Sequence, residues 1–305
     1  MPEPSHVTIL YVVSSPHSGS TMLSTILGSH PEVFFAGELY EIPEPAWTPG
    51  VVCSCGQPAS SCPFWGPVRE TFERSANVED LHRDEGTYRN WKSLPRALLR
   101  GSGSEGDFRR YAGRLETLVR SIAAQSGKRI VVDTSKGATR GIAYSELQSS
   151  GVDVKFLHVV RDGRGVVVSR KNREARVATP GGYAAHAALR YSLLWVGANL
   201  SYVLLFGLRT ERYLRLRLED FSRDPERAFQ RLGRFLGIDL SELGSRVRAE
   251  EAFPVGHVIA GNRMRLRGEV RMRPEASDWA NQLPARDRRA FFWVAGLTAR
   301  LFGYS

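Results

Sequence analysis

The stretch Val7–Thr21, VTILYVVSSPHSGST, decides the fold of this 305-residue chain. Its apolar, β-branched run predicts a buried strand over about 7–13, which ends at a loop of serine, proline and glycine. The apolar spacing that resumes at Met22 predicts a helix over about 20–29. A strand that leads through a tight loop into a helix presents backbone N–H groups and the positive end of the helix dipole to a ligand. The segment therefore predicts a loop that binds phosphate.

The side chains of this loop support that interpretation and narrow it. Ser18, Ser20 and Thr21 supply hydroxyl donors, and Gly19 lets the backbone approach a ligand closely. The loop of nucleotide-hydrolysing proteins reads Gly-x-x-x-x-Gly-Lys-Ser/Thr. Here Ser14 replaces the first glycine and Ser20 stands where the lysine belongs. Without that lysine the β- and γ-phosphates of ATP lose their main cation, which disfavours a kinase or an ATPase.

The rest of the chain predicts strands that alternate with helices, an order typical of a parallel α/β sheet. Further strands are expected at 33–36, 130–132, 154–160 and 213–218, and further helices at 108–126, 183–207, 224–237 and 284–302. Residues 41–66 and 250–274 have loop-like compositions. We find no repeat and no clear linker. The expectation is one domain over 1–305, in which 41–110 is an insertion on the acceptor side.

Composition and charge limit the partners and the compartment. A hydrophobic fraction of 42% supports a sizeable core, and 42 Lys+Arg against 32 Asp+Glu give a net charge of +10, which suits an anionic ligand. Nucleic acid is not expected, because the arginines are spread out without an aromatic-interleaved motif. No apolar run reaches the roughly 18 residues of a membrane span, and no secretory signal is visible. These features predict a cytoplasmic protein without a membrane span.

The three cysteines, Cys53, Cys55 and Cys62, all fall in the first loop-like segment. A disulfide between Cys62 and one of the other two is one interpretation, and it needs an oxidising compartment. A metal site is a second, because three cysteines and a distant histidine make four ligands. Free thiols that pack a turn-rich insertion are the third. The sequence leaves all three open.

A second strand end carries another group of anion-binding residues. The strand that ends at Val160 leads into Arg161-Asp162-Gly163-Arg164, and Ser169 lies eight residues after Arg161, about two turns into the next helix. Ligands of open α/β sheets gather at the carboxyl ends of the strands. A guanidinium and a hydroxyl at such an end suit a phosphate dianion.

Together the two segments resemble the nucleotide motifs of sulfotransferases that use 3′-phosphoadenosine 5′-phosphosulfate (PAPS). Residues 16–21 resemble the 5′-phosphosulfate loop, although the family has Lys or Arg where this chain has His17. Arg161 and Ser169 match the 3′-phosphate motif and its spacing. The form of both is most like the tyrosylprotein and carbohydrate branches. The resemblance is specific over about 7–40 and 130–172 and looser over 213–275, and it implies a P-loop-like α/β fold with PAPS as co-substrate.

The resemblance also implies roles in chemistry. Glu38 matches the position that supplies the base in the tyrosylprotein-like branch, and Lys136 matches a lysine that touches the transferred group. His17 is expected to donate to the leaving phosphate, or to compete with Glu38 as the base if it stays neutral. Arg263 and Arg265 lie in a late segment that closes over the nucleotide in the family.

Other side chains are candidates for the same site. His186 and His257 are further candidate bases, and Trp47, Trp65 and Tyr88 are candidates to line an acceptor pocket, although core packing is the default for each. The cysteine segment, Cys-x-Cys-Gly…Cys-Pro-Phe-Trp, resembles an insertion found in some of these sulfotransferases.

The predicted reaction is transfer of a sulfuryl group from PAPS to a hydroxyl, or to an amine as a second option, with release of 3′-phosphoadenosine 5′-phosphate. The acceptor is expected to be a small molecule, a glycan or a peptide, and no metal is required. A P-loop small-molecule kinase that needs Mg²⁺ is one alternative. A nucleotide- or nucleic-acid-binding protein without catalysis is the other.

Overall fold

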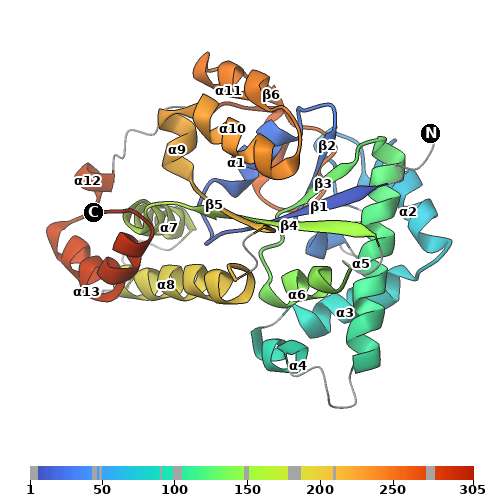
Figure 1. The fold of residues 1–305 in the computed structure, drawn as a ribbon, viewed down its shortest axis with the longest axis horizontal. Helices are drawn as coiled ribbons and strands as arrows, with labels where there is room; N and C mark the ends of the chain where they lie inside the picture. The colour runs from blue at the N-terminus through green and yellow to red at the C-terminus, as the bar shows by residue number, and fades with distance from the viewer. Residues whose placement is uncertain are drawn as a thin grey trace.

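A five-stranded parallel sheet forms the centre of the molecule, in the order β2-β3-β1-β4-β5 (Figure 1). The computed structural model describes residues 6–42, 47, 50–89, 91–98, 105–147, 151–177, 187–208, 211–272 and 279–305. The strands are β1 (Val7–Val13), β2 (Val33–Gly37), β3 (Ile130–Asp133), β4 (Val152–Val160) and β5 (Tyr213–Arg217). All four neighbouring pairs are parallel, so the carboxyl ends of the strands lie along one edge. The predicted α/β class is confirmed.

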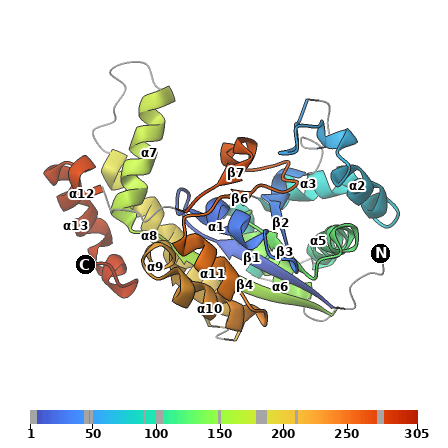
Figure 2. The same cartoon turned by 90° about the horizontal axis from the view of Figure 1, so that it is seen from above.

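Helices cover both faces of this sheet (Figures 1 and 2). One face carries α1 (Ser20–Leu27), α10 (Pro225–Leu236) and α11 (Ser241–Arg248), and the other carries α5 (Glu105–Ser126), α6 (Ala138–Glu146) and α8 (Ala187–Phe206). Leu10 and Val12 of β1 pack into the first core, whereas Tyr11 and Val13 pack into the second. Burial on both sides explains why β1 reads as a continuous apolar run.

The remaining elements pack around the sheet and its two helical layers. α7 (Gly163–Val177), α12 (Trp279–Gln282) and α13 (Ala285–Leu301) form a third core with α8. The insertion contains η3 (Ala59–Ser61), α2 (Trp65–Glu73), α3 (Val78–Tyr88), η4 (Trp91–Ser93) and α4 (Leu94–Leu98). Near the carboxyl edge lie η1 (Leu39–Glu41), α9 (Leu218–Arg223), η6 (Arg263–Arg267) and a hairpin of β6 (Phe253–Pro254) and β7 (Glu269–Val270).

The predicted element boundaries differ from the observed ones by a few residues. The loop predicted at 250–274 contains the β6–β7 hairpin, whose two-residue strands are too short to give an alternating pattern. The first four residues of the helix predicted at 183–207 lie outside the described residues. His186 is one of them. Trp47, Trp65 and Tyr88 of the insertion are buried in the hydrophobic core, so packing is their observed role.

One helix bears on the expectation of no membrane span. Among the described residues, α8 has the length and the apolar composition of a membrane-spanning helix. The sequence reading missed it because polar residues interrupt the apolar run. Length and composition alone are weak support for a span, since helices in the cores of soluble proteins satisfy the same test. In this structure α8 packs against α7 and α13.

The loop between β1 and α1 depends on Gly19. Its φ of +75° lies in the left-handed region, where a side chain is strained. A Cβ at this position would also lie 2.7 Å from Cδ2 of Leu218, which follows β5. Both backbone strain and close packing therefore require glycine at the turn into α1.

We expect Gly19→Ala to lower the free energy of unfolding by about 2–4 kcal/mol, because left-handed strain and overpacking add. Gly237→Ala is the matched control: Gly237 has a φ of +72° and nothing within 4 Å of the added Cβ, so only the strain should remain. Urea denaturation of both variants measures the difference. Equal losses would contradict the role given to Leu218, and so would failure of Leu218→Ala to recover part of the Gly19→Ala loss.

Candidate functional site

The predicted phosphate loop is a compact turn held together by its own hydroxyls. Ser14 Oγ donates to Ser20 Oγ at 3.2 Å, and the Ser15 and Ser18 hydroxyls are 2.7 Å apart. All four serines are buried. The first N–H groups of α1 have no intrahelical partners, as in any helix, and the first turn of α1 contains no acidic residue. The turn therefore offers an anion a ring of donors without a competing carboxylate in that turn.

The two predicted phosphate motifs meet at His17. Arg161 Nη1 donates to the His17 carbonyl oxygen at 3.0 Å, and Ser169 Oγ lies 3.1 Å from His17 Nδ1. The contact arises because β1 and β4 are neighbouring parallel strands, with Val13 opposite His158. The segments that bring these residues together are 144 and 152 positions apart in the chain. The structure thus joins the residues that the sequence placed at two separate strand ends.

The imidazole of His17 sits in positive surroundings. Burial, as the largest cause, and the nearby charges of Arg170, Arg173, Arg161 and Lys136 together lower its pKa from 6.5 to about 4. His17 is therefore neutral at pH 7 in the ligand-free protein. The same cations create the field that an anionic ligand requires.

Arg170 and Arg173 were not singled out from the sequence. They lie one and four residues after Ser169 on α7, and the basic run Arg170-Lys171 was the available signal. Their effect on His17 is visible only once α7 is placed beside the β1–α1 loop.

Hydrogen bonds to the backbone at Arg161 and Asp162 hold Arg161 in place. Trp195 Nε1 of α8 donates to the Arg161 carbonyl oxygen at 3.0 Å. The next residue, Asp162, accepts from the Arg164 guanidinium at 2.7 Å, and its N–H donates to Glu219 at 2.9 Å. Arg164 thus closes the turn into α7.

Glu38 and Lys136 form an ion pair at the ends of the neighbouring strands β2 and β3. Lys136 Nζ donates to Glu38 Oε1 at 2.7 Å, and both side chains are largely buried. The backbone of Lys136 has a φ of +64°, and Tyr202 donates to its carbonyl oxygen at 2.8 Å. Tyr11 donates to the next carbonyl, that of Gly137, also at 2.8 Å. These two hydroxyls hold the turn that presents Lys136.

The buried carboxylate of Asp133 ties the Glu38 and Lys136 loops together. It accepts from the N–H groups of Leu39 and Ser135 at 3.3 and 2.8 Å. On the other side it accepts from Arg140 Nε and the Tyr144 hydroxyl, each at 2.8 Å. Asp133 therefore caps the turn that follows β3, and the same carboxylate also fixes the residue that follows Glu38.

The late basic loop reaches the same region through its backbone. The N–H of Gly261 donates to Glu41 Oε2 at 2.9 Å. Arg265 Nη1 donates to the Val52 carbonyl at 2.7 Å, so its guanidinium contacts the insertion, and Arg263 is exposed on η6. The ring of His257, a candidate base, lies beside cysteine sulfurs. The nucleotide contact of Arg263 and Arg265 stays a prediction.

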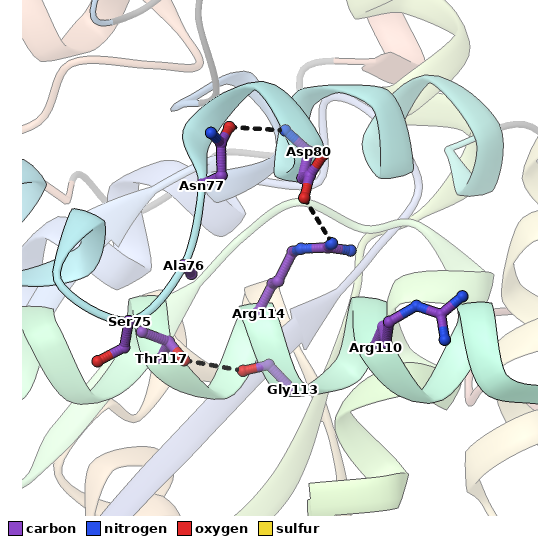
Figure 3. Close-up of a pocket in the computed structure, with 8 residues that line it drawn as sticks. All are labelled: Ser75, Ala76, Asn77, Asp80, Arg110, Gly113, Arg114 and Thr117. Atoms are coloured by element: carbon purple, nitrogen blue, oxygen red, sulfur yellow. Dashed lines mark hydrogen bonds and ion pairs between the residues drawn. The ribbon is translucent and has the colours of Figure 1, made fainter.

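A separate hollow of about 410 Å³ lies between α3 and α5 (Figure 3). Its walls include the Arg114–Asp80 ion pair at 2.8 Å and Asn77, which caps α3. It shares no residue with the β1–α1 loop or with the ends of β2, β3 and β4. Its charged groups are already paired, so we do not assign it to the chemistry.

Sequence comparison finds relatives among known proteins. Human carbohydrate sulfotransferases 6 and 5 are each 25% identical over 75% of this chain, and the aligned region spans 64% and 61% of their lengths. The chain thus spans less than two thirds of the curated relatives it matches. No protein-family model matches the chain.

Structure comparison finds the same fold in sulfotransferases. The sulfotransferase domain of the Synechococcus PCC 7002 olefin synthase aligns with a TM-score of 0.50 and 21% identity, covering 98% of both chains. The sulfotransferase domain of the curacin biosynthetic pathway gives 0.51 and 16%, also with 98% of both chains covered. Mouse sulfotransferase SULT7A1, complexed with PAP, gives 0.50 and 14% over 98% of this chain. The chain has the sulfotransferase fold, and the family resemblance predicted from the two motifs is confirmed.

The sequence comparison corrects the predicted compartment. The expectation of a cytoplasmic protein is wrong, because both curated relatives are carbohydrate sulfotransferases, a type of enzyme that points away from the cytoplasm. The sequence reading relied on the absence of a leader or span, which is not a positive signal for any compartment.

Proposed function

We propose that this protein of the sulfotransferase fold transfers a sulfuryl group from PAPS to a hydroxyl of a carbohydrate or another small acceptor. The single observation that carries the proposal is the meeting of both phosphate motifs at His17. The sequence similarity to carbohydrate sulfotransferases supports the same reaction and favours a sugar hydroxyl.

Donor binding follows from the positions of the cations and the loop. The N–H groups and hydroxyls of residues 18–21 would hold the 5′-phosphate, because the N-terminus of α1 and the serine hydroxyls converge there. Arg161 and Ser169 would hold the 3′-phosphate through a guanidinium and a hydroxyl. Both groups now contact His17, so the nucleotide would take over contacts that already exist within the site.

Transfer needs a base, a stabilised leaving group and an in-line approach. Glu38 would take the acceptor proton as the acceptor oxygen bonds to sulfur. The bond between sulfur and the 5′-phosphate oxygen breaks, and the charge left on that oxygen is stabilised by Lys136 and by the His17 ring. An ammonium has three donors, so Lys136 can keep its contact with Glu38 and still reach the transferred group.

We assign the acceptor side to the insertion at 41–110. Its segment around Val52 is bonded to the late loop through Arg265, and the late loop is bonded to Glu41 beside the proposed base. A kinase is disfavoured, because Ser20 still occupies the position of the loop lysine.

Arg161→Ala should weaken binding of 3′-phosphoadenosine 5′-phosphate by about 10- to 100-fold, since a charge-assisted contact to the 3′-phosphate is lost. Binding of ADP, which lacks that phosphate, should change by less than about threefold. Isothermal titration calorimetry measures both. Arg231→Ala is the matched control, because it removes one exposed arginine outside the site and lowers the net charge equally. Equal affinity of the wild type for the two nucleotides would contradict the proposed donor.

Glu38→Gln should lower kcat by about 10²–10⁴-fold while the affinity for 3′-phosphoadenosine 5′-phosphate stays within a few-fold. The amide keeps the shape of the side chain but cannot take a proton. Transfer of labelled sulfate from PAPS to a panel of glycan acceptors measures the rate. Glu70→Gln, an exposed residue on α2, is the control. Full activity in Glu38→Gln together with its loss in His17→Asn would reassign the base to the histidine.

The affinity for 3′-phosphoadenosine 5′-phosphate should rise as the pH falls from 8 to 5, relative to His17→Asn. The free protein holds the His17 pKa at about 4, and a bound dianion would raise it. By linkage, a pKa that is higher in the complex makes binding tighter at lower pH, by about 30-fold between pH 8 and pH 5 if the pKa returns to its usual value of about 6.5. The asparagine variant carries the same phosphate titration and so serves as the baseline. A constant ratio between the two proteins would show that His17 stays neutral in the complex.

A further inference from the structure

Three sulfurs and one imidazole converge in the insertion. Sγ of Cys53, Cys55 and Cys62 and a ring nitrogen of His257 all lie within 4.8 Å of one another. The cysteines come from a ten-residue turn segment, and the histidine comes from the late loop, 195 residues after Cys62. Among the described residues this is the one cluster of cysteine, histidine and carboxylate ligands close enough to share an ion.

The distances match those of a tetrahedral metal site. Zn–S bonds of about 2.3 Å and Zn–N bonds of about 2.0 Å place ligand sulfurs about 3.8 Å apart and sulfur about 3.5 Å from nitrogen. Here Cys55 and Cys62 Sγ are 3.8 Å apart, and His257 Nδ1 lies 3.3 Å from Cys62 Sγ and 3.8 Å from Cys53 Sγ. Those separations leave room for one ion at the centre.

We propose that Cys53, Cys55, Cys62 and His257 bind one structural Zn²⁺ ion. Thiolates and an imidazole in tetrahedral geometry select zinc over magnesium or calcium, which prefer oxygen ligands. Four protein ligands fill the coordination sphere and leave no open position for a reacting water. The ion therefore has no part in the sulfuryl transfer proposed above. The proposed zinc site does not depend on that reaction.

The surrounding backbone already has the form of a metal-binding turn. The Gly56 N–H donates to the Cys53 carbonyl at 2.9 Å, and Val52 pairs with Pro58 across the turn. The positive φ of Gly56, +88°, reverses the chain directly after Cys55. The turn thus places Cys53 and Cys55 on the same side as Cys62.

A second set of hydrogen bonds fixes the segment around His257 against that turn. The Ser54 N–H donates to the Val258 carbonyl at 3.0 Å, and the Val258 N–H donates to Ser54 Oγ at 2.8 Å. Trp65 Nε1 donates to the His257 carbonyl at 2.9 Å, and the His257 ring stacks on Phe64 with centroids 5.6 Å apart. The imidazole is therefore held in place by partners other than the cysteines.

The ion would join the insertion to the wall of the active site. Directly after His257, Val258 and Ala260 pack against Gly37, where an added Cβ would lie 2.8 Å from the Ala260 carbonyl oxygen. The following residue, Gly261, donates to Glu41. Loss of the metal should therefore loosen the segment beside Glu38 while the nucleotide loop at the other strand ends stays intact.

The full-length protein, purified under reducing conditions without added metal, should contain one zinc per chain by inductively coupled plasma mass spectrometry. Cys55→Ser and His257→Asn should lose it. His82→Asn, an exposed histidine on α3, is the matched control and should retain it. Cys55 is itself exposed, so its replacement tests ligation without opening the core. Circular dichroism confirms that each variant is folded.

Cobalt provides a second readout that needs no activity. After removal of zinc by a chelator, added Co²⁺ should give the intense visible bands of a tetrahedral site and a thiolate charge-transfer band, and the melting temperature should recover. Wild-type protein without stoichiometric metal and without a cobalt spectrum would overturn the proposal. A Cys55–Cys62 disulfide found by mass spectrometry in protein purified under nonreducing conditions, resistant to zinc, would also overturn it.

Discussion

The parallel pairing of β1 with β4 is the constraint on which the site depends. It sets the loop after β1 beside the first residues after β4, so that His17 meets Arg161 and Ser169. A fixed distance between two phosphate-binding strand ends lets a protein select a bisphosphorylated nucleotide over other anions. Neighbouring elements serve this geometry: Leu218 after β5 packs against Gly19, and Trp195 of α8 holds the backbone of Arg161.

A second pair of neighbouring strands, β2 and β3, supplies the proposed chemical groups. Asp133 is fully buried, and a buried carboxylate is costly unless every lone pair finds a donor. Arg140, Tyr144 and two backbone N–H groups meet that requirement, and one of those N–H groups belongs to the residue after Glu38. The hydrogen bonds that satisfy the buried charge of Asp133 therefore also make a rigid support for Glu38 and Lys136. Their ion pair joins the two strand ends in the same way that His17 joins β1 and β4.

Short-range patterns in the sequence predicted much of this arrangement. The strand, loop and helix at 7–27 and the spacing of Arg161 and Ser169 are local features, so the fold class and the proposal of two anion-binding ends follow from them. Contacts between distant segments had no local signal. The bond from Leu39 to Asp133 spans 94 residues, and His257 could not be chosen from seven histidines as the partner of the cysteines. The lowered pKa of His17 had no local signal either, because α7 brings Arg170 and Arg173 to it only in the folded chain.

That electrostatic setting accounts for the one departure from the family pattern. A lysine at position 17 would add a permanent charge beside Arg161, Arg170 and Lys136, and the repulsion would have to be offset before any ligand arrived. A histidine avoids this cost, because its ring is neutral while the site is free and its Nδ1 is within hydrogen-bond distance of the Ser169 hydroxyl. When a dianion enters, the balance of charge reverses and protonation becomes favourable. The weaker donor is therefore compatible with the proposed phosphate binding, since Arg170 and Arg173 of α7 add positive charge beside the loop.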